Sequence, residues 1–118
     1  MDKQVIEKHL SNLKGSIGSY PFGPEVLVFK VMNKMFALIA KKDDKSILTL
    51  KASPANVEFL TCKYDDITPG YHMNKEHWIT IYLTGEVSES EILKLIDESY
   101  SLIVSKLTKD KKLELMAL

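Results

Sequence analysis

Two histidines and one cysteine are the side chains of this sequence best suited to metal or nucleophilic chemistry. Glu76 lies between His72 and His77, but a five-residue spacing that runs into a strand matches no common zinc pattern. A histidine could act as the base for Cys62, yet a cysteine at the end of an apolar helix favours a buried structural thiol. We therefore expect neither a metal site nor a cysteine nucleophile.

The sequence also offers no good candidate residues for acid–base catalysis or for binding a cofactor. Adjacent carboxylates occur at Asp43-Asp44 and Asp65-Asp66, but neighbouring side chains point apart and both pairs lie in expected turns. The five glycines are scattered at turns and form no phosphate-binding loop or nucleophile elbow. We expect a protein that is not an enzyme and that has no cofactor.

Lysine supplies all the positive charge, because the 16 basic residues include no arginine and are balanced by 16 acidic ones. This neutrality gives no support to nucleic-acid binding, and the lack of arginine disfavours reading of base sequence. Residues 26–52 nevertheless hold six lysines against two aspartates, whereas residues 86–100 hold five acids against one lysine. The molecule then has either oppositely charged sides or ordinary solvated faces.

The segment 71–78, Tyr-His-Met-Asn-Lys-Glu-His-Trp, is dense in aromatic rings and hydrogen-bond donors. Such groups complete a small core and a turn, or they form a binding surface. Both interpretations remain open at this stage.

The elements around this segment follow from hydrophobic periodicity and from turn and capping residues. Glycines and prolines make 15–24 a loop, held down by Tyr20 and Phe22. Ser53-Pro54 begins a short helix that ends near Cys62, and Ser88 with Glu91 begins the longest helix. We expect helices at 2–13, after Ser53, after Ser88 and after Thr108, and strands at 25–31, 35–40, 46–51 and 78–83.

These elements predict an α+β fold with a single antiparallel sheet and helices packed on one face, in one domain spanning 1–118. Alternation along the last strand turns Ile79 and Ile81 toward the helices. Trp78, Thr80 and Tyr82 would then form an open aromatic face on the other side.

The lone cysteine and the absence of a signal-like start or a long apolar run indicate a cytoplasmic protein with no membrane segment. We expect a monomer.

Residues His72–Leu83, with the pattern Asn74-Lys75-x-His77-Trp78 running into a strand, resemble the signature of the MmcQ/YjbR-like family. The runs 29–31, 35–38 and 48–51 and the Ser53-Pro54 helix start resemble the same family in order and spacing. The resemblance implies a fold similar to the CyaY/frataxin arrangement. Family members are described as DNA-binding proteins with a double-wing motif, which would make the two hairpin tips the wings.

Two functional hypotheses follow from these observations. In the first, the chain contacts the phosphates of double-stranded DNA through lysines of the hairpins and neighbouring segments: Lys34, Lys41, Lys42, Lys45, Lys51 and Lys75. In the second, it captures a protein or peptide partner on the open aromatic face. The family-motif surface comprises His72, Asn74, His77, Trp78, Thr80 and Tyr82.

Overall fold

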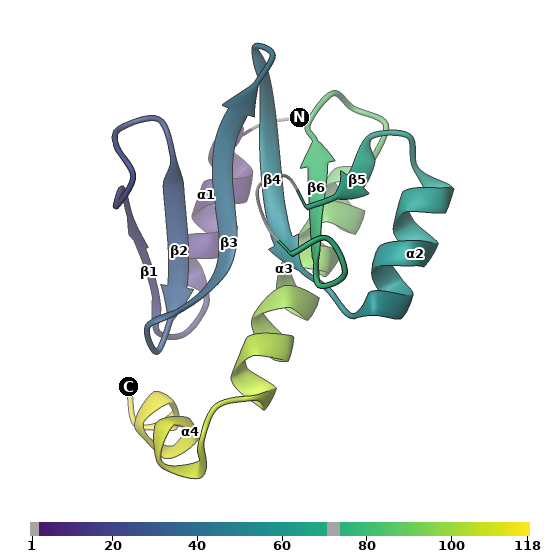
Figure 1. Ribbon diagram of the computed structural model, residues 1–118. Coiled ribbons are helices and arrows are strands. Elements are labelled where there is room, and N and C mark those ends of the chain that lie inside the picture. Colours follow the sequence, from purple (N-terminus) through teal and green to yellow (C-terminus); the bar gives the residue numbers. More distant parts are fainter. Residues whose placement is uncertain (1–2, 71–73) are drawn as a thin grey trace.

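The computed structural model describes residues 3–70 and 74–118. Its six strands form one antiparallel sheet in the order β1-β2-β3-β4-β6-β5 (Figure 1). The elements are α1 (Lys3–Asn12), β1 (Ser16–Ser19), β2 (Leu27–Val31), β3 (Lys34–Lys42), β4 (Lys45–Lys51), α2 (Pro54–Lys63), β5 (Ile67–Pro69), β6 (Trp78–Tyr82), α3 (Glu89–Ser105) and α4 (Lys109–Met116).

The helices confirm the predicted arrangement on one face of the sheet. Helix α3 packs on β2, β3 and β4, while α1 packs on β1 and contacts α3. Helix α2 contacts β5 and β6 at the far side of the sheet, and Val57 and Leu60 enter the same core. Figure 1 shows α4 apart from these helices, below the lower end of the sheet.

Helix starts lie where their capping residues predict. The Ser53, Ser88 and Thr108 hydroxyls accept hydrogen bonds from the backbone N–H groups of Asn56, Glu91 and Lys111, and Pro54 opens the first turn of α2. Each side chain satisfies a helix N–H that has no partner within the helix. The sequence therefore located these three helices closely.

Strands β2, β3 and β4 lie where strands were expected at 25–31, 35–40 and 46–51, although those of the second hairpin are longer than expected. Asn33 and Met32 both have positive φ in the first turn, and Asp43 and Asp44 do so in the second. Two consecutive left-handed residues give the two-residue turn that fits the twist of a hairpin. The second turn is therefore only two residues long, and its lysines belong to the strands.

Two predictions about the 15–24 segment are wrong. Ser16–Ser19 forms the edge strand β1, paired with β2 from Ser16 opposite Val31 to Ser19 opposite Val28. Tyr20 and Phe22 do not hold the segment down, because both side chains are largely exposed. A strand of small residues with an exposed Ile17 lacks the buried alternation that identifies strands in a sequence.

A register shift between Phe29 and Lys30 opens the ladder between β2 and β3 near the lower end. Phe36 is fully buried there and meets the ring of Tyr100 edge-on, at 5.5 Å between centroids. The Ser99 hydroxyl donates to the Phe36 carbonyl at 2.6 Å and accepts from the Lys51 N–H at 2.9 Å. Helix α3 thus bridges the lower ends of β3 and β4.

Candidate basic site

The predicted DNA-contacting lysines divide between two ends of the sheet. Lys34 begins β3, and Lys51 ends β4 opposite Trp78. Lys41, Lys42 and Lys45 lie instead at the β3–β4 turn, which points to the upper end in Figure 1. Lys42 lies eight residues along the strand from Lys34, which corresponds to about 26 Å at about 3.3 Å per residue. That distance is well beyond the Debye length of about 8 Å, so the two groups act separately.

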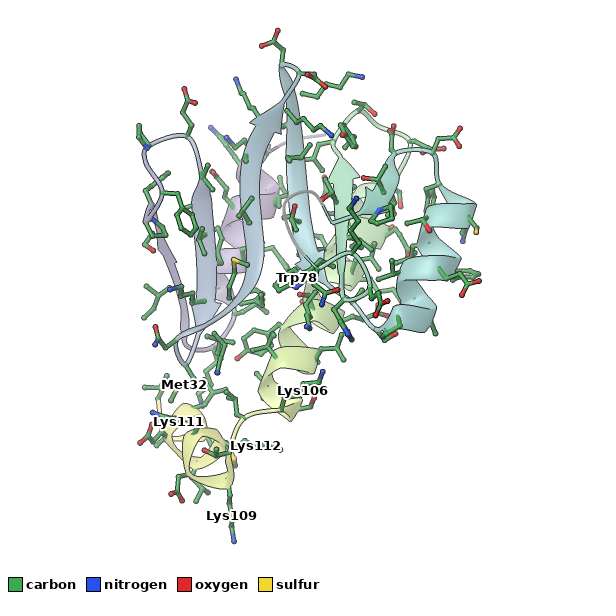
Figure 2. The ribbon with its side chains drawn as sticks, viewed as in Figure 1. Met32, Trp78, Lys106, Lys109, Lys111 and Lys112 are labelled. Atoms are coloured by element: carbon green, nitrogen blue, oxygen red, sulfur yellow. The ribbon has the colours of Figure 1, made fainter. Side chains whose placement is uncertain are left out.

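The lower end gathers lysines from segments far apart in the sequence. Figure 2 shows Lys106, Lys109, Lys111 and Lys112 at this end, with Met32 of the β2–β3 turn and Trp78. Nine lysines of the described residues belong to the strand ends, turns and helix ends that meet here, and Glu76, Glu98, Asp110 and Glu114 lie among them. We call this set the basic end: Lys14, Lys30, Lys34, Lys51, Lys75, Lys106, Lys109, Lys111 and Lys112.

Acidic residues gather at the opposite end of the sheet, in the loops and turns that Figure 1 places at the top. Asp43 and Asp44 stand between the predicted wing lysines, in the turn itself. The other acids lie in the β1–β2 loop, before β5 and around the start of α3: Glu25, Asp65, Asp66, Glu86, Glu89 and Glu91. These acids outnumber the lysines of the same end, which are Lys3, Lys41, Lys42, Lys45 and Lys63, so the neutral chain folds into a molecule with an acidic and a basic end.

Lys51 lies at the basic end, where its ammonium group is partly desolvated. Its ammonium group lies 5.3 Å from the centre of the Trp78 ring. Burial, and secondly the positive charge of Lys106, lower the pKa of Lys51 below the ordinary 10.5. An anion placed between Lys51 and Lys106 would stabilise both charges.

The aromatic face is closed, which corrects the prediction of an open binding surface. Alternation along β6 is as predicted, since Ile79 and Ile81 enter the core. Trp78 is nevertheless only 9% exposed, and Thr80 is fully buried with its hydroxyl 3.1 Å from that of Thr49. Because β6 lies between β4 and β5, side chains from both neighbours flank a small residue such as threonine.

Tyr82 is half-buried beneath the ammonium group of Lys42, 5.9 Å from the ring centre. Of the residues expected to form the aromatic surface, Trp78 and Tyr82 therefore each carry a lysine above the ring. A ring covered in this way offers little apolar area to a peptide partner.

The family-motif residues that the structure describes shape the entry to β6. The Asn74 side-chain oxygen accepts from the Glu76 N–H at 2.9 Å, and the His77 N–H donates to the Asn74 carbonyl at 3.2 Å. The His77 carbonyl accepts from the Ala52 N–H at 3.0 Å. These bonds tie the loop to the end of β4 and place Lys75 at the basic end. His72 lies outside the described residues.

Neither metal binding nor a buried thiol is seen where the structure describes the chain. Residues 3–70 and 74–118 contain no group of three or more His, Cys, Asp or Glu side chains able to hold a metal ion. Cys62 is exposed on α2, so the prediction of a buried thiol is wrong. The core-facing side of this helix carries Val57 and Leu60, and position 62 faces away from it. No helix in these ranges is long and apolar enough to cross a membrane.

Comparison with known proteins supports the resemblance noted in the sequence. The YjbR family model matches residues 11–102. This chain belongs to the YjbR family. It is 37% identical to the uncharacterised Escherichia coli O157:H7 protein YbdF over 113 residues, which cover 92% of this chain and 93% of YbdF. It is 36% identical to the uncharacterised E. coli K12 protein YjbR over 83 residues, 70% of each chain.

Solved structures share the fold of this YjbR-family chain. The crystal structure of the Deinococcus radiodurans protein DR2400, a DUF419 domain, superposes with a TM-score of 0.87 at 36% identity, covering 95% of this chain and 86% of that one. A Pseudomonas syringae protein superposes with a TM-score of 0.76 at 31% identity, covering 86% and 98%. The single antiparallel sheet with helices on one face is therefore the fold of the family.

The sequence-based hypothesis missed the lysines around α4. Lys106, Lys109, Lys111 and Lys112 fall within seven residues, a run that signals a basic segment. This segment lies beyond the residues that the family model matches. Lys111 is 3.6 Å from the Glu114 carboxylate, whereas Lys109 and Lys112 extend from the same helix without such an ion pair among the described contacts.

Proposed function

We propose that this YjbR-family chain binds double-stranded DNA through its phosphate backbone, using the basic end. The observation that carries the proposal is the gathering of Lys106, Lys109, Lys111 and Lys112 at one end of a chain with no net charge (Figure 2), beside Lys51 at the end of β4. A local excess of positive charge supplies the sequence-independent part of DNA affinity even where global charge does not.

The residue types define the kind of contact. Lysine ammonium groups bind phosphates as point charges, whereas bidentate reading of guanine favours arginine, which this chain lacks. Contacts of this kind position and orient the protein on the duplex but do not select a base sequence. The expected complex is weak, salt-sensitive and indifferent to sequence.

Lys51 and Lys106 form the centre of the proposed contact. Their mutual repulsion and the burial of Lys51 raise the free energy of the unbound protein, and a phosphate between them would lower it. Lys109 and Lys112 of α4 extend the same positive surface below Trp78 (Figure 2). The upper turn contributes less, because Asp43 and Asp44 offset its lysines.

The test is fluorescence anisotropy of labelled duplex DNA at low and moderate salt, with two matched triple variants. The first changes Lys106, Lys109 and Lys112 to glutamine at the basic end. The control changes Lys41, Lys42 and Lys45 to glutamine at the opposite end, with the same loss of charge.

We expect the basic-end variant to lose most of its affinity and the control to retain it. Each phosphate contact contributes about −0.9 to the slope of log K against log salt, so the loss of three contacts should make the slope shallower by about 2.7. Equal losses in the two variants, or binding that does not depend on salt, would overturn the proposal.

A second measurement reports on Lys51 directly. Trp78 is the single tryptophan of the chain and lies beneath the Lys51 ammonium group. DNA binding at the basic end should change its fluorescence, and Lys51→Gln should reduce that change. Binding without any tryptophan response would place the DNA elsewhere on the molecule.

A further inference from the structure

Strand β1 is an edge strand without the features that normally prevent edge pairing. It hydrogen-bonds only to β2, and residues 15–24 contain no charged side chain. Lysines, prolines within the strand or a covering helix usually block such an edge. The opposite edge is different, since β5 has three residues, ends in Pro69 and contacts α2.

Exposed apolar side chains follow this edge over its whole length. Ile17 is 69% exposed on β1, and Phe22 is 74% exposed in the loop above it. At the lower end, α4 and the residues after it are held near the start of β1, because the Lys14 ammonium group donates to the Met116 carbonyl at 2.8 Å. Except for Phe59, the exposed large apolar residues described all lie in these segments: Ile17, Tyr20, Phe22, Leu113, Met116 and Leu118.

We propose that the β1 edge is the interface of a symmetric homodimer, in which two β1 strands pair antiparallel and join the sheets. A two-fold axis near Ile17 and Gly18 reverses one copy relative to the other. The loop with Tyr20 and Phe22 of one copy then lies beside Gly15 and the C-terminal segment of its partner. Both exposed apolar groups are covered by the same contact.

Charge favours the same arrangement. The loop after β1 shares a surface depression with Glu7, Glu25, Asp43 and Asp44, which outnumber the two lysines that line it, Lys3 and Lys41. The start of β1 lies instead at the basic end, next to α4. Antiparallel pairing places the acidic end of each copy beside the basic end of the other, whereas parallel stacking would oppose like charges.

The strand itself accommodates a second copy. Gly18 lies against the Phe29 ring, and a Cβ at this position would come within 2.9 Å of a ring carbon. Glycine therefore lets β1 pack closely against the core on this face. Ile17 projects from the other face, opposite Lys30. The expected pairing adds main-chain hydrogen bonds along β1 and brings the two Ile17 side chains close together.

The test measures molecular mass by light scattering and sedimentation from micromolar to millimolar protein. We expect the mass to rise toward that of a dimer, and Ile17→Lys to weaken association by at least about tenfold, since it sets like charges near the two-fold axis. Phe59→Lys is the matched control, because Phe59 is 60% exposed but lies on α2, far from β1. A monomer at every concentration, or equal effects of the two variants, would overturn the proposal.

Amide hydrogen exchange supplies a second test that needs no variant. In a dimer, the outward N–H groups of β1 are protected at high protein concentration and lose that protection on dilution. Exchange in β1 that does not depend on concentration, while the mass does, would place the interface elsewhere and overturn the proposal.

Discussion

Replacing Ser99 with alanine tests how helix α3 holds the lower ends of β3 and β4 together. The paired registers of these strands end at Ala37 opposite Leu50. One residue further, the Ser99 hydroxyl stands between the strands, accepting from the Lys51 N–H and donating to the Phe36 carbonyl. The hydroxyl takes the place of a direct ladder bond where the strands part.

The expected loss follows from the two backbone groups that alanine would leave without a partner. Ser99 is fully buried, and the space of one hydroxyl is too small for a water molecule. Each buried unsatisfied group costs about 1–3 kcal/mol, so the variant should lose about 2–6 kcal/mol of unfolding free energy. For a chain of this length, with an unfolding entropy of about 2.1 cal/mol/K per residue, Tm should fall by about 8–24 °C.

The measurement is urea unfolding followed by circular dichroism, with Ser105→Ala as the control. The Ser105 hydroxyl, on the same helix, donates to the Leu102 carbonyl at 2.7 Å but is exposed, so water replaces it at a cost of at most about 0.5 kcal/mol. A Ser99→Ala loss no larger than that of Ser105→Ala would refute the bridging role.

Three further perturbations test other contacts of the fold and the proposed site. Gly15→Ala should destabilise the packing of α4, because Gly15 has φ of +75° and a Cβ would lie 2.6 Å from a Leu115 methyl carbon; faster hydrogen exchange in α4 would report it. Thr49→Val should lower the free energy of unfolding by about 1 kcal/mol in urea titrations, because it removes the hydroxyl contact with Thr80. If DNA binds at the basic end as proposed, its affinity should begin to fall with rising pH before the ordinary lysine pKa of 10.5 is reached, because phosphates favour the protonated form of Lys51 and the pKa of this group is lowered; anisotropy in Lys51→Gln should lack this part of the profile.

Local signals in the sequence predicted most of the fold. Ser53, Ser88 and Thr108 marked helix starts because capping depends only on residues within one turn. Asn33 lies between the strands expected at 25–31 and 35–40 and has the left-handed backbone that asparagine tolerates in a tight turn. Alternation from Trp78 to Tyr82 predicted which side chains of β6 face the core. Each of these inferences needs only neighbouring residues.

The errors arose where a residue's environment is made by distant parts of the chain. Strand β1 exists because β2 offers it an unpaired edge, and its own residues carry no strand pattern. Trp78 and Thr80 are buried because flanking strands close around them, which alternation along one strand cannot show. Cys62 is exposed because α2 turns only Val57 and Leu60 toward the core.

The charge distribution shows most clearly what the tertiary structure decided. The sequence determined a neutral chain with a lysine-rich block at 26–52 and an acidic block at 86–100. In an antiparallel meander, successive turns point to opposite ends, so the lysine block is divided between the two ends. Lys14, Lys34, Lys51 and Lys106 come together because the termini of four different elements meet at one end of the sheet. The sequence sets how many charged residues the chain has. The direction in which each helix and strand runs decides which of these charges lie close together.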